Sequence, residues 1–365
     1  MLNCETRLFV AAPLLLALIL PAVALAGEKG RPNESSAEAE SLNKQAVASV
    51  AAHDYQQAIE LLKRAIALEP DLVMAHYNLG RIYEAQGQFS LAIEALSRAT
   101  RLDPYFTEAH HYLGLSYNRA ERYEEAIACF QRALQLRPDQ VESLNGLALA
   151  YTRLGRDEEA AECSRKAIQL KPDLADAYNN LAVAYIKMGR RSEAIDLLEQ
   201  ARRLEPDVPD VYNNLGYAYA DASRTREAIA AYQRAIELRP DYHQAFNNLG
   251  VAYCSLGQYE KAKESLQRAI RLKPDEARVY SNLGYAFDQS GRRKEAIEFY
   301  KQALRLEPRL AEAHNNLAIL YLKRGERALA LEQYSLLKLI DYDMSQKLFM
   351  TIYKDKILNA REPNR

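Results

Sequence analysis

Asparagine side chains recur along the chain at a constant spacing and are well suited to hold a ligand. The series Asn145, Asn179, Asn213 and Asn247 advances by 34 residues at each step. An amide side chain offers one acceptor and two donors, which match the acceptor and the donor of a peptide unit. A row of such amides on one face of a protein can therefore bind an extended backbone without reading its side chains.

Composition excludes other kinds of chemistry. The 365 residues are 48% hydrophobic and 27% charged, which is typical of a chain that folds. Lys and Arg together number 48 against 49 acidic residues, so the formal net charge is -1. Because binding to a phosphate backbone depends on clustered positive charge, we expect no nucleic-acid partner.

Residues typical of catalysis or metal binding form no known motif here. The sequence has no phosphate-binding glycine loop, no HExxH and no nucleophile elbow. Adjacent residues on a helix point about 100° apart, so His110 and His111 are not expected to share a metal ion. We place His110 in the core and His111 on the opposite, ligand-side face. The four cysteines are too few and too irregular for a disulfide framework or a zinc site, and we expect free thiols. The prediction is a protein that is not an enzyme and has no cofactor or metal.

The N-terminus resembles a bacterial secretory signal peptide, predicted over residues 1–26. An apolar run, Leu8 to Leu20, follows Arg7 and leads to the small-residue cleavage pattern Ala24-Leu25-Ala26. The alternative is an uncleaved membrane anchor, because Leu8 to Ala26 is 19 residues, just enough to span a hydrocarbon core of ~30 Å. Residues 27–38 are polar and unperiodic and predict a flexible linker. We expect an exported protein, periplasmic or secreted, that contacts a membrane only if residues 1–26 are retained.

Prolines mark a repeat. Eight of the thirteen prolines follow one another at intervals of 34 residues, which predicts a solenoid of supersecondary units that bury their cores against one another. The prolines are Pro70, Pro104, Pro138, Pro172, Pro206, Pro240, Pro274 and Pro308. Nine repeats then cover residues 39–344, and they begin at Ala39, Val73, Thr107, Val141, Ala175, Pro209, His243, Ala277 and Ala311. Positions below are counted from these starts.

Each repeat is predicted to form two helices. Apolar residues recur at helical spacing, stop near the middle and resume. Position 15 is glycine in six repeats, where the left-handed conformation after a helix end is expected, and the proline at position 32 ends the second helix. The Asp that follows the proline in six repeats is expected to cap the next helix. Alanine at position 20 and Gly or Ala at position 8 allow close helix packing around the aromatic residue of position 11.

These features resemble the tetratricopeptide repeat family. Repeat five reads ADAYNNLAVAYIKMGRRSEAIDLLEQARRLEPDV, with Tyr178, Leu181, Ala182, Tyr185 and Ala194 among its signature residues. The resemblance implies an all-α fold, a right-handed α-solenoid whose first helices form a concave groove. Residues 345–365 are predicted to be a capping helix and tail, because Leu348 and Ile352 give Ser345 to Ala360 an apolar face.

The resemblance also implies which residues line the groove. Positions 2, 5, 6, 9, 12 and 13 of the first helix lie opposite its core side. Position 5 carries asparagine in six repeats, and position 6 carries it in six: Asn43, Asn145, Asn179, Asn213, Asn247 and Asn315, then Asn78, Asn180, Asn214, Asn248, Asn282 and Asn316. Position 9 is apolar in eight repeats and is predicted to be a floor that faces solvent: Val47, Leu115, Leu149, Val183, Tyr217, Val251, Tyr285 and Ile319.

We therefore predict a binding groove for a protein or an extended peptide. Its expected residues are Asn145, Asn179, Asn213, Asn247, Asn315, Asn180, Asn214, Asn248, Leu149, Val183, Tyr217 and Val251. The position-5 amides are expected to have no structural partner, whereas those of position 6 have the alternative of bonding within or between repeats. The acids at position 2 either cap helices or attract a basic ligand.

Family members that clamp the carboxylate at the C-terminus of chaperone peptides use Lys at position 5 and Asn at position 9. This chain has neither, so it is not expected to bind chaperone tails. Three functions remain open: an interaction scaffold of the bacterial cell envelope, an inner-membrane tethered adaptor facing the cytoplasm, and a regulatory subunit of an enzyme that processes or exports an envelope polymer such as a glycan.

Overall fold

The predicted all-α class is confirmed. A computed structural model describes residues 34–361, and this range forms 19 α-helices arranged as helix-turn-helix pairs. No helix within it is long and apolar enough to cross a membrane. The predicted signal peptide and residues 27–33 of the predicted linker lie outside the described residues.

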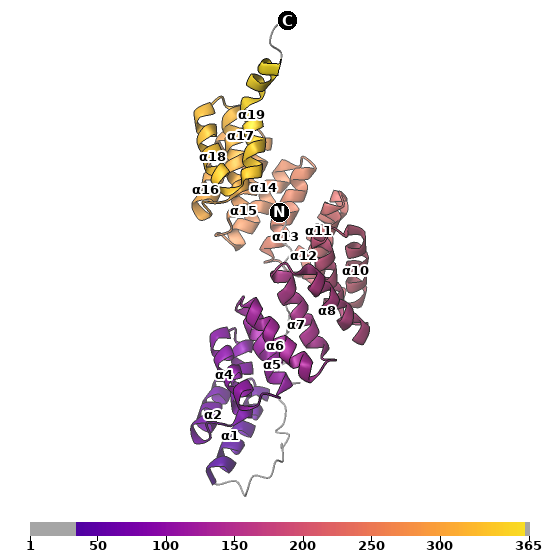
Figure 1. The fold of residues 1–365 in the computed structure, drawn as a ribbon, viewed down its shortest axis with the longest axis vertical. Coiled ribbons are helices and arrows are strands. Elements are labelled where there is room, and N and C mark those ends of the chain that lie inside the picture. The colour runs from indigo at the N-terminus through magenta and orange to yellow at the C-terminus, as the bar shows by residue number, and fades with distance from the viewer. Residues whose placement is uncertain (1–33, 362–365) are drawn as a thin grey trace. The chain divides into compact units, whose positions relative to one another are not determined.

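Contacts divide the chain after Leu204 into two units, which we describe separately (Figure 1). The N-terminal unit contains α1 (Glu34–Ala51), α2 (Tyr55–Leu68), α3 (Val73–Ala85), α4 (Phe89–Leu102), α5 (Thr107–Arg119), α6 (Tyr123–Leu136), α7 (Val141–Arg153), α8 (Asp157–Leu170), α9 (Ala175–Lys187) and α10 (Arg191–Leu204). The C-terminal unit contains α11 (Pro209–Asp221), α12 (Thr225–Leu238), α13 (His243–Ser255), α14 (Tyr259–Leu272), α15 (Ala277–Gln289), α16 (Arg293–Leu306), α17 (Ala311–Lys323), α18 (Arg327–Ile340) and α19 (Tyr342–Arg361).

The turn inside each repeat has the backbone conformation expected at position 15. The six glycines there have positive φ, for example 76° at Gly189. His53, Glu121 and Ser223 occupy the same position in the other three repeats and also have positive φ, 61°, 59° and 61°. The left-handed turn is therefore a property of the repeat, and glycine only makes it easier to adopt.

The expected aspartate caps are wrong. The N-cap of each first helix from α3 to α17 is the residue after the aspartate position, and no side chain caps any of these helices. The aspartates lie in the turn after the proline, one residue too early to reach the first free N–H groups. Asp71 and Asp207 instead form ion pairs with Arg98 and Arg234 of the following second helices.

Packing within a repeat depends on position 8 of the first helix and position 24 of the second. Phe130 and Tyr232 at position 24 are fully buried against Gly114 and Gly216 at position 8. A Cβ atom built on Gly216 would lie 2.5 Å from the ring of Tyr232, which is too close for any side chain. Position 20 is buried alanine in all nine repeats, as expected for close packing of the two helices.

Both ends of the helix array differ from the regular repeat. Helix α1 begins at Glu34, so residues 34–38, expected to be linker, are helical, and Ser35 and Ser36 donate hydrogen bonds to Leu68 and Glu69 at the end of α2. At the other end, α19 packs on α17 and α18 and buries Leu348 and Ile352. It begins at Tyr342, three residues before the predicted cap, because Asp341 accepts a hydrogen bond from the backbone N–H of Met344.

Candidate functional site

The first helices of neighbouring repeats contact one another within each unit. Contacts join α1, α3, α5, α7 and α9 in sequence in the N-terminal unit, and α11, α13, α15 and α17 in the C-terminal unit. We call the surface along these contacts the inner face. It carries positions 5, 6 and 9, so it contains the residues predicted to bind a ligand.

On the inner face, the asparagines form a ladder of hydrogen bonds between repeats. The amide nitrogen of position 6 donates to the amide oxygen of position 5 in the preceding repeat. The bonds run from Asn78 to Asn43 (3.0 Å), from Asn180 to Asn145 (2.6 Å), from Asn248 to Asn213 (3.1 Å) and from Asn282 to Asn247 (2.8 Å). The expectation that the position-5 amides have no structural partner is therefore wrong. The position-6 amides bond between repeats, which was the alternative to ligand binding.

Burial explains why these amides pair with one another. Asn145, Asn179, Asn180, Asn213, Asn214, Asn247 and Asn248 are all buried. A buried amide without a partner would lose its hydrogen bonds to water, at about 1–3 kcal/mol. The amide of the neighbouring repeat supplies one such bond, although Oδ1 of Asn78 and Nδ2 of Asn213 stay without a partner. Asn282, Asn315 and Asn316, in the last two repeats, are half-buried.

The apolar row at position 9 differs between the two units. Leu115, Leu149 and Val183 of the N-terminal unit are buried, which contradicts the prediction of a solvent-facing floor there. The first helices α5, α7 and α9 that carry these residues contact one another. In the C-terminal unit, Tyr217, Val251 and Ile319 are half-buried, and Tyr285 is 42% exposed.

Repeats two to four interrupt the ladder. Position 9 of repeat two is Arg81, the single charged residue in the apolar row, and its guanidinium lies 4.2 Å from the ring centroid of Tyr112. Arg81 is buried, as is Tyr77, which takes the asparagine position. Burial raises the pKa of Glu84 nearby, although the charges of Arg119 and Arg81 oppose this. The break in the apolar row at residue 81 was the sequence signal for this cluster.

His111 takes the place of asparagine at position 5 of repeat three. It is buried, and its Nδ1 lies 2.9 Å from the hydroxyl of Ser143, which in turn donates to Oε1 of Gln140 at 2.8 Å. Because the serine proton is given to Gln140, His111 must donate through Nδ1 and does not act as a base toward Ser143. The expected placement was reversed: His110 is half-buried and bonds the carbonyl of Pro104.

The His111→Asn variant is expected to remove part of the acid sensitivity of the protein. Burial lowers the pKa of His111 to about 4. An unfolded chain takes up this proton near the ordinary pKa of about 6.5, so stability is lost as the pH falls from about 6.5 to about 4. The loss is at most about 3 kcal/mol.

Urea denaturation at several pH values measures this effect. The difference between wild type and His111→Asn isolates His111 from His110, whose pKa burial also lowers. Equal pH slopes for the two proteins would show that His111 is not held neutral by burial.

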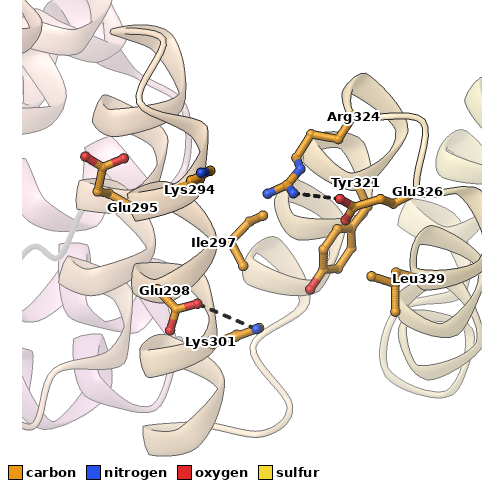
Figure 2. Close-up of a pocket in the computed structure, with 9 residues that line it drawn as sticks. All are labelled: Lys294, Glu295, Ile297, Glu298, Lys301, Tyr321, Arg324, Glu326 and Leu329. Carbon is orange, nitrogen blue, oxygen red and sulfur yellow. Dashed lines mark ion pairs between the residues drawn. The ribbon is translucent and has the colours of Figure 1, made fainter.

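Hollows lie at the ends of the repeat array. Near the C-terminus, Asn315 and Ile319 of the inner face line a hollow of about 450 Å³ whose opposite wall is Asp343, Met344 and Lys347 of α19. Another hollow, of about 490 Å³, lies between α16 and the α17–α18 pair (Figure 2). A third, of about 570 Å³, lies between α2 and the α3–α4 pair.

Within residues 34–361, no cluster of His, Cys, Asp and Glu has the make-up of a metal site. Cys129, Cys163 and Cys254 are free thiols, as predicted. Burial raises their pKa values, to about 12, about 11 and about 11, so none is present as a reactive thiolate near neutral pH.

Family models match most of the described chain. Residues 35–208 match the model for the Cilia and flagella-associated protein 70 C-terminal domain. Residues 179–243, 241–306 and 289–346 match three models of the tetratricopeptide repeat. No curated protein matches the sequence.

Solved structures share the fold. The structure of the APC/C hetero-tetramer Cut9-Hcn1 is similar at a TM-score of 0.62 and 18% identity, over 88% of this chain and 64% of that chain. A tetratricopeptide repeat protein from Parabacteroides merdae ATCC 43184 is similar at 0.59 and 18% identity, over 69% and 99%. MamA is 30% identical over 46% of this chain and 97% of that chain, with a TM-score of 0.40. The chain spans about two thirds of the Cut9-Hcn1 chain that it resembles.

Proposed function

Since the chain is a tetratricopeptide repeat protein, we propose that it is a non-catalytic scaffold that holds a partner protein on the inner face of its C-terminal unit. Stacked helical repeats keep extended, rigid surfaces available because their cores are buried between repeats. The partner segment is an extended peptide that lies across successive first helices.

The accessible apolar row of the C-terminal unit carries this proposal. Tyr285 is 42% exposed, and Val251 and Ile319 on either side of it are half-buried. Apolar side chains that repeat along one exposed face favour a binding surface. In the N-terminal unit, Leu115, Leu149 and Val183 of the same row are buried, and Arg81 interrupts it.

The asparagine ladder has a supporting role in this proposal. Its hydrogen bonds hold neighbouring first helices at fixed spacing, so the apolar row keeps its geometry without a ligand. Asn315 is the exception among the predicted contacts, because it makes no hydrogen bond within the described residues and lines the hollow beside α19. We propose that its amide bonds the backbone of the partner.

Substitution of Tyr285 tests the proposal. The Tyr285→Glu variant is expected to bind the partner recovered from the source cells at least ~30-fold more weakly than wild type, because a buried aromatic contact is worth about 2 kcal/mol or more. Crosslinking with affinity purification identifies the partner, and calorimetry measures its binding. Tyr105→Glu is the matched control, since Tyr105 is 75% exposed and belongs to the N-terminal unit. Normal binding by a folded Tyr285→Glu protein would rule out this surface.

Export remains part of the proposal. It is supported by the apolar run Leu8 to Leu20 ahead of Ala24-Leu25-Ala26. The intact mass of the same purified protein is expected to show a chain that begins at Gly27. A membrane-bound chain that keeps residues 1–26 would favour the tethered adaptor, and an envelope-polymer enzyme among the purified partners would favour the regulatory subunit.

A ciliary location is the alternative to export, and it is supported by a family model. The model matched by residues 35–208 is named for a cilia and flagella-associated protein. A ciliary scaffold would keep its first residues and would be found in the axoneme fraction, so the same mass measurement distinguishes it from an exported protein.

A further inference from the structure

An ion pair recurs at the turn between the two helices of a repeat. In five repeats, Arg at position 16 pairs with Glu at position 19, and its guanidinium lies over the aromatic ring of position 11 at 3.6–4.7 Å from the centroid. The pairs are Arg122–Glu125, Arg156–Glu159, Arg190–Glu193, Arg224–Glu227 and Arg292–Glu295. We call this arrangement the turn clamp. It covers the ring with a neutralised ion pair.

Four repeats lack the turn clamp, and in two of them, repeats two and nine, an apolar residue takes the place of the glutamate. Position 19 is Leu91 in repeat two and Leu329 in repeat nine, and these leucines are 43% and 40% exposed. Position 16 is Gln88 in repeat two and Glu326 in repeat nine. A hollow lies beside each leucine, with the position-11 tyrosine in its lining.

The hollow in the C-terminal unit is balanced in charge. Figure 2 shows Lys294, Glu295, Glu298 and Lys301 from α16, opposite Arg324 and Glu326. Arg324 pairs with Glu326 at 2.7 Å, and Lys301 lies 3.6 Å from Glu298. Arg324 and Lys301 therefore already have anionic partners, and the three acids of the lining balance its three bases, so its net charge does not select an anionic ligand.

The hollow in the N-terminal unit has an excess of positive charge. Its rim carries Lys63, Arg98 and Arg101 against the single carboxylate of Glu94. Arg98 pairs with the exposed Asp71 at 2.7 Å, whereas Lys63 and Arg101 have no ion pair within the described residues. An anionic ligand would thus meet cations that are free to bind it.

The floor of this hollow is apolar. Ile66 of α2, Leu79 and Tyr83 of α3 and Leu91 of α4 line it, in a volume of about 570 Å³. That volume is enough for one or two large side chains, because pockets of ~300–1,000 Å³ hold whole small ligands. The site thus combines an apolar recess with a basic rim.

We propose that this hollow between α2 and the α3–α4 pair is a second docking site, which takes an acidic peptide segment with a large apolar anchor. A Leu or Phe side chain enters the recess beside Leu91. Asp and Glu residues that flank it contact Lys63 and Arg101. The site lies in the N-terminal unit and is independent of the function proposed for the inner face.

A synthetic peptide tests this proposal on the full chain. The probe is a fluorescein-labelled peptide of Asp and Glu around a central Leu-Phe pair, and the control replaces every acid by lysine. Fluorescence anisotropy is expected to show saturable binding of the acidic peptide only. Binding should weaken as salt rises from about 50 mM to about 500 mM, because exposed charge pairs are screened.

Variants copied from the chain's own repeats make the test specific. The double variant Gln88→Arg with Leu91→Glu installs the turn clamp over Tyr83 and is expected to weaken binding at least ~10-fold while the fold is kept. Reversal of charge in Lys63→Glu with Arg101→Glu is expected to weaken it by a similar factor. The matched control, Glu326→Arg with Leu329→Glu, installs the clamp in repeat nine and is expected to change nothing.

Three outcomes would overturn the proposal. The acidic peptide could fail to saturate at about 1 mM, which corresponds to no useful affinity. It could bind the Gln88→Arg with Leu91→Glu variant as well as wild type. Alternatively, vesicles containing phosphatidylglycerol could bind wild type and not this variant while the peptide does not bind, which would assign the basic rim to a membrane surface.

Discussion

The Arg239→Met variant is expected to lose about 3–5 kcal/mol of unfolding free energy in the C-terminal unit, because the substitution leaves a buried carboxylate without its cation. Arg239 donates to both carboxylate oxygens of Asp210, at 2.8 and 3.3 Å, and Tyr242 donates to the same carboxylate at 2.6 Å. All three residues are buried. The network joins the start of α11 to the turn before α13, so its loss should loosen the first repeats of this unit.

A matched pair elsewhere in the chain provides the control. Arg137 and Glu108 occupy the same repeat positions in repeat three, at 2.8 Å, but their side chains are 50% and 27% exposed. Arg137→Met is therefore expected to cost at most about 1 kcal/mol, as surface pairs do. Urea denaturation measures both variants, with hydrogen exchange followed in α11 and α13 for Arg239→Met and in α5 and α7 for Arg137→Met. Equal losses in the two would show that burial does not set the strength of this ion pair.

The second large effect is expected from the asparagine ladder. The Asn213→Ala and Asn247→Ala substitutions together should lower the unfolding free energy by about 1.5–4.5 kcal/mol. The buried amide N–H of Asn248 loses its acceptor, at about 1–3 kcal/mol, and the half-buried Asn282 loses a hydrogen bond worth about 0.5–1.5 kcal/mol. Helix propensity alone predicts no loss of unfolding free energy, since alanine is the better helix former. The buried bond outweighs that propensity.

A double-mutant cycle separates the ladder from simple helix propensity. Removing both partners, in Asn213→Ala with Asn248→Ala, should cost less than the sum of the single changes. Asn315→Ala is the control, because Asn315 is half-buried and makes no hydrogen bond within the described residues. Its stability is expected to stay within about 0.5 kcal/mol of wild type. Additive losses at Asn213 and Asn248 would mean that the two amides act separately.

Local patterns in the sequence predicted the fold class and the residues at which the first helices of the repeats begin. Eight of the nine predicted repeat starts are the first residues of α3, α5, α7, α9, α11, α13, α15 and α17. This succeeded because helical periodicity, turn geometry and proline effects are local and recur at every 34 residues. The 34-residue period also placed the first helices next to one another, so the sequence found the inner face.

Contacts between repeats set which inner-face residues are available to a partner. The ladder depends on an amide 35 residues away in the next repeat, and no local pattern reports whether it lies within hydrogen-bonding distance. The same holds for His111, buried through its contact with Ser143, and for Val183, which is buried where its counterpart Tyr285 is exposed. Burial on the inner face depends on contacts between neighbouring repeats. At the turn of a repeat, a single side chain, such as Leu91 in place of glutamate, decides whether the position-11 ring is covered by an ion pair.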